Sequence, residues 1–273
     1  MEYYVLGVSF VFGTILGSFL NVVISRSPLL HVGRGISAFQ GRSRCDHCGH
    51  VLRWFELLPV VSFFALRGQC ARCSGKIPWR YTLVEICMGF LVFFLAYLFL
   101  INALVPISGL RAIILLLALF SLAGIFFFDL WHYLIPDSLL LIFGFSALGE
   151  AFFRLAQSSA SQIVPESLVS LITSMFASFL FFFVIWYFSN GRAMGFGDVK
   201  LAPLIPLFLG VAGGIAALVV SFWIGALVSL ALLAAKRKSM KDIIPFGPFM
   251  VVGTLLIFFY PETVYYLFPF LIF

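Results

Sequence analysis

Charged side chains are scarce in this sequence. They make up 10% of the 273 residues, whereas soluble domains carry about a quarter. Hydrophobic residues account for 63%, with 35 Phe among them, and a chain of this length cannot remove so much apolar surface from water. This scarcity excludes the soluble globular class and predicts an integral membrane protein in contact with the lipid bilayer.

Charge is missing altogether from several long runs. The charge-free runs are 3–25, 86–110, 112–128, 167–191, 201–235 and 243–261. A membrane-spanning helix needs about 20 residues, and the run 201–235 contains the glycine-rich stretch GVAGG, so two short spans fit it better than one. The first run lacks a basic start and a cleavage site, which indicates a retained span. We predict about eight transmembrane helices, near 3–25, 82–104, 111–129, 138–155, 167–188, 199–211, 214–235 and 247–270.

Basic residues are almost absent from one side of these predicted spans. With the N-terminus outside, the loops on the cytoplasmic side hold 15 of the 17 Lys and Arg residues, nine of them in residues 26–80, and only Arg111 and Arg154 fall elsewhere. The positive-inside rule therefore orients the chain. Because the net charge of +6 follows from topology and no separate basic domain is present, we expect no nucleic-acid partner.

Cysteine is rare and clustered. Cys45 and Cys48 form one C-x2-C pair, and Cys70 and Cys73 form a second, within the one long polar segment, 26–80. This spacing is typical of four-cysteine zinc sites, and the reducing cytoplasm disfavours disulfides. Four thiolates leave no open coordination position, so we predict a structural zinc ion. Four free or redox-active thiols are the alternative.

Two acidic residues stand at the ends of predicted spans. Asp129 ends the third span in FFFDLWHYLIPD, and Asp198 begins the sixth in GFGD, so both lie at the cytoplasmic side. Two carboxylates that share a site provide an acid and a base, which together can activate water against an amide bond. Gly195 and Gly197 permit unusual backbone angles and the close approach of a substrate strand.

Each acid also has a simpler interpretation. Asp198 could cap a helix, Asp129 could be an interfacial charge, and Asp137 is most simply the N-cap of the fourth span. In a different class of protein, a transporter, membrane-embedded acids act as proton or ion relays. Transporter sites lie near the midplane of the membrane, whereas these acids cluster at one face. The pair, together with the GxGD pattern, favours catalysis.

The same segments resemble a known family. GFGD resembles the GxGD signature of intramembrane aspartyl proteases, and RAMGFGDVKLAPLIPLFLG with FDLWHYLIPDSLLL resembles the type IV prepilin peptidases. GSFLNVVISRSP near the N-terminus, the two-knuckle cysteine loop and IPFGPFMVVG near the C-terminus are similar to further segments of that family. The resemblance covers nearly the whole chain.

The resemblance implies a function. It implies cleavage of the basic leader of a type IV prepilin, or of a type II secretion pseudopilin, at the cytoplasmic face of the bacterial inner membrane. It also implies N-methylation of the new N-terminus with S-adenosylmethionine as donor. Asp129 and Asp198 fall on the catalytic aspartates, Gly195, Gly197 and Lys200 belong to the motif around them, and the four cysteines fall on the metal ligands. A peptidase without methyltransferase activity remains an alternative, because no glycine-rich loop for the methyl donor is recognisable.

These features predict an all-α polytopic membrane protein with a small cytoplasmic zinc-binding loop domain. Its expected parts are a first transmembrane helix (1–25), the zinc-binding loop domain (26–80) and a membrane-embedded aspartyl protease domain (81–273).

Overall fold

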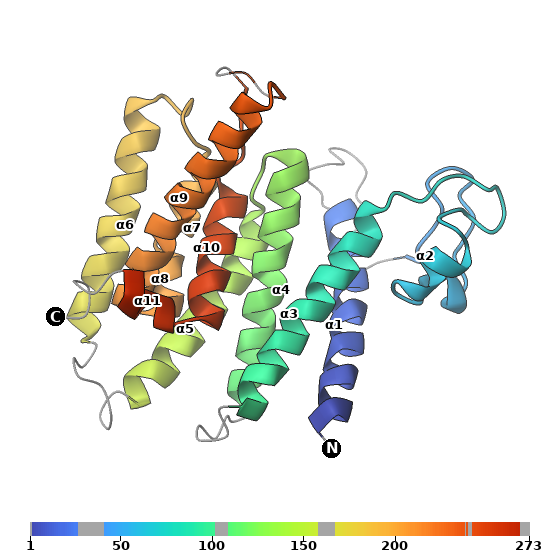
Figure 1. The fold of residues 1–273 in the computed structure, drawn as a ribbon, viewed down its shortest axis with the longest axis horizontal. Coiled ribbons are helices and arrows are strands. Elements are labelled where there is room, and N and C mark those ends of the chain that lie inside the picture. The colour runs from blue at the N-terminus through green and yellow to red at the C-terminus, as the bar shows by residue number, and fades with distance from the viewer. Residues whose placement is uncertain are drawn as a thin grey trace. The chain divides into compact units, whose positions relative to one another are not determined.

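The computed structural model describes residues 2–26, 41–101, 109–157, 167–237, 239 and 242–267. Within these ranges the regular elements are helices, apart from two isolated bridges in the cysteine segment. The chain divides into two compact units, Met1–Pro106 and Ile107–Phe273, and each has its own set of packed helices (Figure 1).

Among the described residues, six helices are long and apolar enough to cross a bilayer: α1 (Glu2–Ser25), α3 (Arg80–Ile101), α4 (Gly109–His132), α5 (Asp137–Gln157), α6 (Leu168–Phe188) and α9 (Val211–Ala234). The remaining helices are shorter: η1 (Trp54–Leu57), α2 (Val61–Ala65), α7 (Phe196–Leu201), α8 (Leu204–Leu209), α10 (Gly247–Phe259) and α11 (Glu262–Leu267). The predicted all-α membrane class is confirmed, and the helix count is close to the predicted eight.

The differences in count come from two predicted spans. The span expected near 199–211 consists of two six-residue helices, α7 and α8, separated at Pro203, because proline lacks the N–H that a continuous helix needs. The described helix at the last predicted span, α10, has 13 residues. The expected division of 201–235 is present, since Gly210 with φ +86° ends α8 and α9 begins at the next residue.

In the first unit, α1 and α3 pack along their length (Figure 1). Glycines make the contact close: a Cβ on Gly13 would lie 2.6 Å from the carbonyl oxygen of Met88, and one on Gly17 would lie 2.6 Å from the Cα of Glu85. Small residues let helices in a membrane approach in this way. The cysteine segment is anchored to this pair, because the Glu85 carboxylate accepts a 2.8 Å hydrogen bond from the backbone N–H of Val60.

In the second unit, α4 is the most enclosed helix. Its apolar stretch is 67% buried, against 22–39% for the other five long helices, and it packs against α5 and α10. The short helix α8 lies against α5 and α9, and α7 contacts α5, α6 and α10. The ends of α4, α7 and α10 therefore belong to one packed group.

Several predicted features fall outside the described residues. These are the loop 102–108, the loop 158–166, most of 26–40, and Lys238 and Lys241 of the basic cluster after α9. The three-part division of the chain stays a prediction.

Candidate active site and metal centre

Asp129 lies in the last turn of α4 and is 6% exposed. The helix ends three residues later, and the chain reverses through Tyr133, whose φ is +56°. The Asp129 carboxylate accepts a hydrogen bond from the backbone N–H of Gly247, the first residue of α10. A buried carboxylate needs such partners because burial removes the water molecules that would otherwise hydrogen-bond to it.

Asp198 is the third residue of α7 and is 5% exposed. Its Oδ2 accepts a 3.2 Å hydrogen bond from the backbone N–H of Gly195, the residue that precedes the helix. An acid in this position commonly bonds back to the helix start. Asp198 is therefore not an N-cap, since the N-cap is Gly195, but one of its oxygens stabilises the start of α7. The other oxygen, Oδ1, is buried with no hydrogen-bond partner among the described residues. Capping does not explain that atom, since buried polar atoms are nearly always paired.

The two aspartates come within electrostatic range of each other. Glycines allow the three elements around them to approach. A Cβ on Gly247 would lie 2.5 Å from Asp129 Oδ2, and a Cβ on Gly197 would lie 2.9 Å from the Cβ of Ile135, in the turn after α4. The ends of α4, α7 and α10 therefore meet at a point that tolerates no side chain on either glycine.

The motif glycines act differently from the expectation. Gly195 has φ −74°, and neither it nor Gly197 is among the residues with positive φ, so the predicted unusual backbone angles are wrong. A Cβ on Gly195 would meet its nearest atom, Asp198 Oδ2, at an ordinary 3.7 Å. Only Gly197 is needed for close approach in this structure, and its neighbour is Ile135.

Lys200 binds the start of α5. Its Nζ lies 2.6 Å from Oδ1 of Asp137 and 5.4 Å from the ring centroid of Phe196. Asp137 is the first residue of α5, so it lies within the first helical turn, and its carboxylate pairs with Lys200 at a largely exposed position.

Sequence reasoning missed Gly247 and Ile135 as parts of this site. Ile135 gives no signal in the sequence, because an apolar residue before a proline is ordinary. Gly247 stands between Phe246 and Pro248 at the start of a helix, and a glycine in that setting is the one available hint of a close contact.

The four predicted metal ligands come together in the first unit. The Sγ atoms of Cys45, Cys48, Cys70 and Cys73 all lie within 4.8 Å of one another, and all four are free thiols. Sulfur ligands about 2.3 Å from a tetrahedral zinc ion are separated by about 3.8 Å, and Sγ of Cys45 and Sγ of Cys73 are 3.8 Å apart. The donor set therefore fits a four-thiolate zinc ion.

The two knuckles have the same backbone design. In each, the first cysteine carbonyl accepts the N–H of the residue four positions later, at Gly49 and Ser74, and both of these residues have positive φ. Backbone hydrogen bonds from Arg72 and Cys73 lower the pKa of the Cys70 thiol to about 7. A thiol that ionises near neutral pH is a ready metal ligand.

Comparison with known proteins gives consistent matches. Residues 11–99 match the bacterial peptidase A24 N-terminal domain, and residues 113–230 match the type IV leader peptidase family. Three relatives are each described as "Prepilin leader peptidase/N-methyltransferase". That of Stutzerimonas stutzeri is 29% identical, over 89% of this chain and 86% of its own length. That of Myxococcus xanthus is 33% identical, over 84% and 64%, and that of Bacillus subtilis is 30% identical, over 95% and 96%. No solved structure matches the chain.

Proposed function

Because the chain belongs to the type IV leader peptidase family, we propose that it cleaves the leader of a type IV prepilin or a type II secretion pseudopilin by aspartic-protease chemistry. The observation that carries the mechanism is the meeting of two buried carboxylates, Asp129 from α4 and Asp198 from α7, within electrostatic range of each other. Oδ1 of Asp198, which has no hydrogen-bond partner in the described part of the chain, is available to accept a hydrogen bond from a reacting group.

The proposed reaction uses the two aspartates as an acid and a base. Two carboxylates in one buried site hold one proton between them. The ionised carboxylate removes a proton from water, the water oxygen bonds to the scissile carbonyl carbon, and the protonated carboxyl donates to the carbonyl oxygen. Collapse of the tetrahedral intermediate breaks the C–N bond: the carboxyl that took its proton from water gives that proton to the leaving nitrogen, and the other carboxylate takes back a proton from a hydroxyl of the intermediate.

We place this site at the cytoplasmic face of the bacterial inner membrane. The support is the distribution of basic residues: Arg192 and Lys200 flank the GFGD segment, and Lys236 and Arg237 follow α9, in the connection that leads to α10. Loops rich in Lys and Arg stay on the cytoplasmic side. A prepilin whose basic leader is still in the cytoplasm meets the aspartates on that side.

We further propose that the protein methylates the new N-terminus with S-adenosylmethionine. The support is the description of the relatives, each a leader peptidase and N-methyltransferase.

Zinc held by the four cysteines gives the small loop domain its folding energy, because little apolar core is available to it outside the membrane.

One experiment tests both activities. The detergent-purified protein is incubated with a prepilin and S-adenosylmethionine, and the product is analysed by mass spectrometry. The proposal predicts loss of the leader followed by the mass of one methyl group. An uncut prepilin would contradict the proposed peptidase, and a cut but unmethylated product would leave a peptidase alone.

A further inference from the structure

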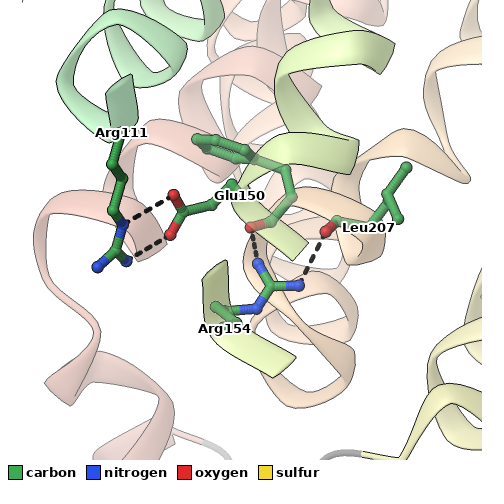
Figure 2. Close-up of polar contacts among 5 residues, drawn as sticks. Arg111, Glu150, Arg154 and Leu207 are labelled. Carbon is green, nitrogen blue, oxygen red and sulfur yellow. Dashed lines mark hydrogen bonds and ion pairs between the residues drawn. The ribbon is translucent and has the colours of Figure 1, made fainter. Parts of the chain in front are cut away.

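The two basic residues that the positive-inside pattern leaves unexplained lie together inside the second unit. Arg111, in the first turn of α4, forms a two-bonded ion pair with Glu150 of α5: its Nη2 lies 2.6 Å from Oε1 and its Nε lies 3.0 Å from Oε2 (Figure 2). Glu150 is 5% exposed. A planar, doubly bonded pair of this kind fixes the orientation of both side chains.

Arg154 follows one turn later on α5 and reaches a different helix. Its guanidinium donates one hydrogen bond to the carbonyl of Phe208 and another, of 2.8 Å, to the carbonyl of Leu207 (Figure 2). These carbonyls belong to the last turn of α8, where a helix has no partners of its own for its carbonyl groups. Carbonyls without partners are costly in a membrane protein's interior. Arg154 therefore supplies the hydrogen-bond donors that the last carbonyls of α8 lack.

The three side chains connect the two elements that carry the aspartates. Asp129 is on α4, and Arg111 ties α4 to α5. Asp198 is on α7, which leads directly into α8, and Arg154 ties α8 to α5. We refer to Arg111, Glu150 and Arg154 as the polar network.

Helix α5 contacts the α7–α8 segment at both of its ends. At the start of α5, Asp137 pairs with Lys200 of α7 at 2.6 Å. Farther along, the ring of Phe143 lies 5.5 Å from that of Phe208. At the far end, Arg154 holds the last carbonyls of α8. The Lys200 pair is largely exposed, and exposed pairs contribute little, so the part-buried hydrogen bonds of Arg154 give the firmer hold.

We propose that Arg154 of α5, the helix that the Arg111–Glu150 ion pair joins to α4, is a positioning residue that sets the depth of the α7–α8 segment and hence the place of Asp198 relative to Asp129. This inference rests on the proposed function of the two aspartates. The segment needs such a hold because its two six-residue helices have no continuous hydrogen-bond ladder across Pro203. Misplacement of a catalytic group by about 1 Å can lower a rate by about a hundredfold.

The test compares variants of the full-length protein in detergent. Arg154→Met fills a similar volume and removes both hydrogen bonds to α8. Arg154→Lys keeps the positive charge but donates from a single nitrogen. Arg237→Met changes an exposed arginine at the end of α9 and serves as the control. The measurements are kcat and KM for leader cleavage and the melting temperature of each variant, with assays run well below that temperature.

We expect kcat to fall roughly tenfold to a hundredfold in Arg154→Met, with KM changed less than about twofold because the substrate-contacting surface is intact. Arg154→Lys should recover part of the loss, and Arg237→Met should behave as wild type. If Arg154→Met does not fold, a smaller fall in kcat with KM changed less than about twofold in Arg154→Lys supports the proposal.

Wild-type kcat in folded Arg154→Met, or in Arg154→Lys if only that variant folds, would overturn the positioning role. A lower melting temperature with unchanged kcat would likewise overturn it, because that result belongs to a purely structural residue. The Asp129→Asn and Asp198→Asn variants separate this inference from the proposed function. If they retain cleavage, the aspartate mechanism itself is wrong. If they are inactive while the Arg154 variants are normal, only the positioning inference is wrong.

Discussion

The two oxygens of Asp198 have different surroundings. Oδ2 accepts the Gly195 N–H and stabilises the start of α7, whereas Oδ1 is buried with no partner among the described residues. The first contact orients the carboxyl group, and the second atom stays available for chemistry. In the proposed mechanism, a carboxyl group that this contact has already oriented loses less conformational entropy in reaching a reactive geometry.

At this scale, the first prediction concerns the aspartates themselves. Asp129→Asn and Asp198→Asn should each lower the cleavage rate by about a hundredfold or more, because each removes half of an acid–base pair. The amide is nearly isosteric with the carboxylate, so folding should survive. Asp137→Asn, at an exposed position where the carboxylate pairs with Lys200, should keep most activity. Leader cleavage followed by mass spectrometry measures all three, and wild-type cleavage by Asp129→Asn would refute the assignment.

The second prediction concerns the glycines around the site. Gly247→Ala would place a methyl group 2.5 Å from Asp129 Oδ2, and Gly197→Ala would place one 2.9 Å from the Cβ of Ile135. Both should lower kcat by displacing a carboxylate-bearing element. Gly195→Ala, where the nearest atom is 3.7 Å away and φ is −74°, should have a clearly smaller effect. Equal losses in all three variants would show that steric contact does not explain the motif.

At the scale of elements, the short helices α7 and α8 are the unusual feature. A single long helix would carry its own hydrogen bonds, but these two rely on side chains at their outer ends: Asp198 accepts from the Gly195 N–H at the start of α7, and Arg154 of α5 donates to the last carbonyls of α8. Irregular backbone at membrane depth is tolerated where protein surrounds it. The break into two short helices also brings the backbone N–H groups of the GFGD segment and the Asp198 carboxylate to the end of α4.

The cysteine segment gives the third prediction, at the same scale. Cys70→Ser should lower the zinc content below one ion per chain, measured by elemental analysis. It should also make residues 41–80 sensitive to protease, because metal binding is a main source of folding energy in so small a domain. Cys87→Ser is the matched control, since Cys87 lies in α3, away from the four-thiol cluster.

The activities of that variant separate two roles for the zinc domain. Because no zinc ligand takes part in the proposed aspartate chemistry, Cys70→Ser should impair methylation more than leader cleavage. Loss of cleavage with methylation intact would mean that the domain mainly presents the substrate. Full activity without metal would contradict a structural need for zinc.

At the scale of the whole molecule, the fourth prediction concerns orientation in the membrane. A thiol-reactive probe that cannot cross membranes, added from outside, should label a cysteine introduced at Ser167, which precedes α6, and should miss one at Ser239, beyond α9. Ser167 and Ser239 lie on opposite faces if α6 and α9 each cross the membrane and the α7–α8 segment carries the chain back to the outer side between them. Labelling at Ser239 but not at Ser167 would reverse the proposed orientation of the site, and labelling at both positions would mean that the α7–α8 segment does not cross.

The whole molecule also shows how far pattern alone can reach. Charge-free runs predicted five of the six long helices, because a helix is the structure in which a lipid-exposed backbone satisfies all its own hydrogen bonds. The sixth, α5, was also predicted as a span, but it contains Glu150 and Arg154. The C-x2-C spacing predicted a cluster of four sulfur atoms, and the structure brings them within 4.8 Å of one another. Both features depend on residues that are close together in the sequence, or on the composition of a short stretch of it. Such local information can be read directly from the sequence.

Tertiary structure decided the rest. Arg111 and Glu150 are 39 residues apart, and Arg154 bonds to a carbonyl 53 residues away; no local pattern marks these partners, because any arginine of the chain has the same donors. Likewise, no local pattern shows that Gly247 of α10 lies against Asp129 of α4. The sequence by itself determined which long segments are helical, which four cysteines form a cluster and which acids stand at helix ends. Packing alone decided that the end of α4 and the starts of α7 and α10 meet at one point, since contact between distant elements depends on how their side chains fit together in three dimensions.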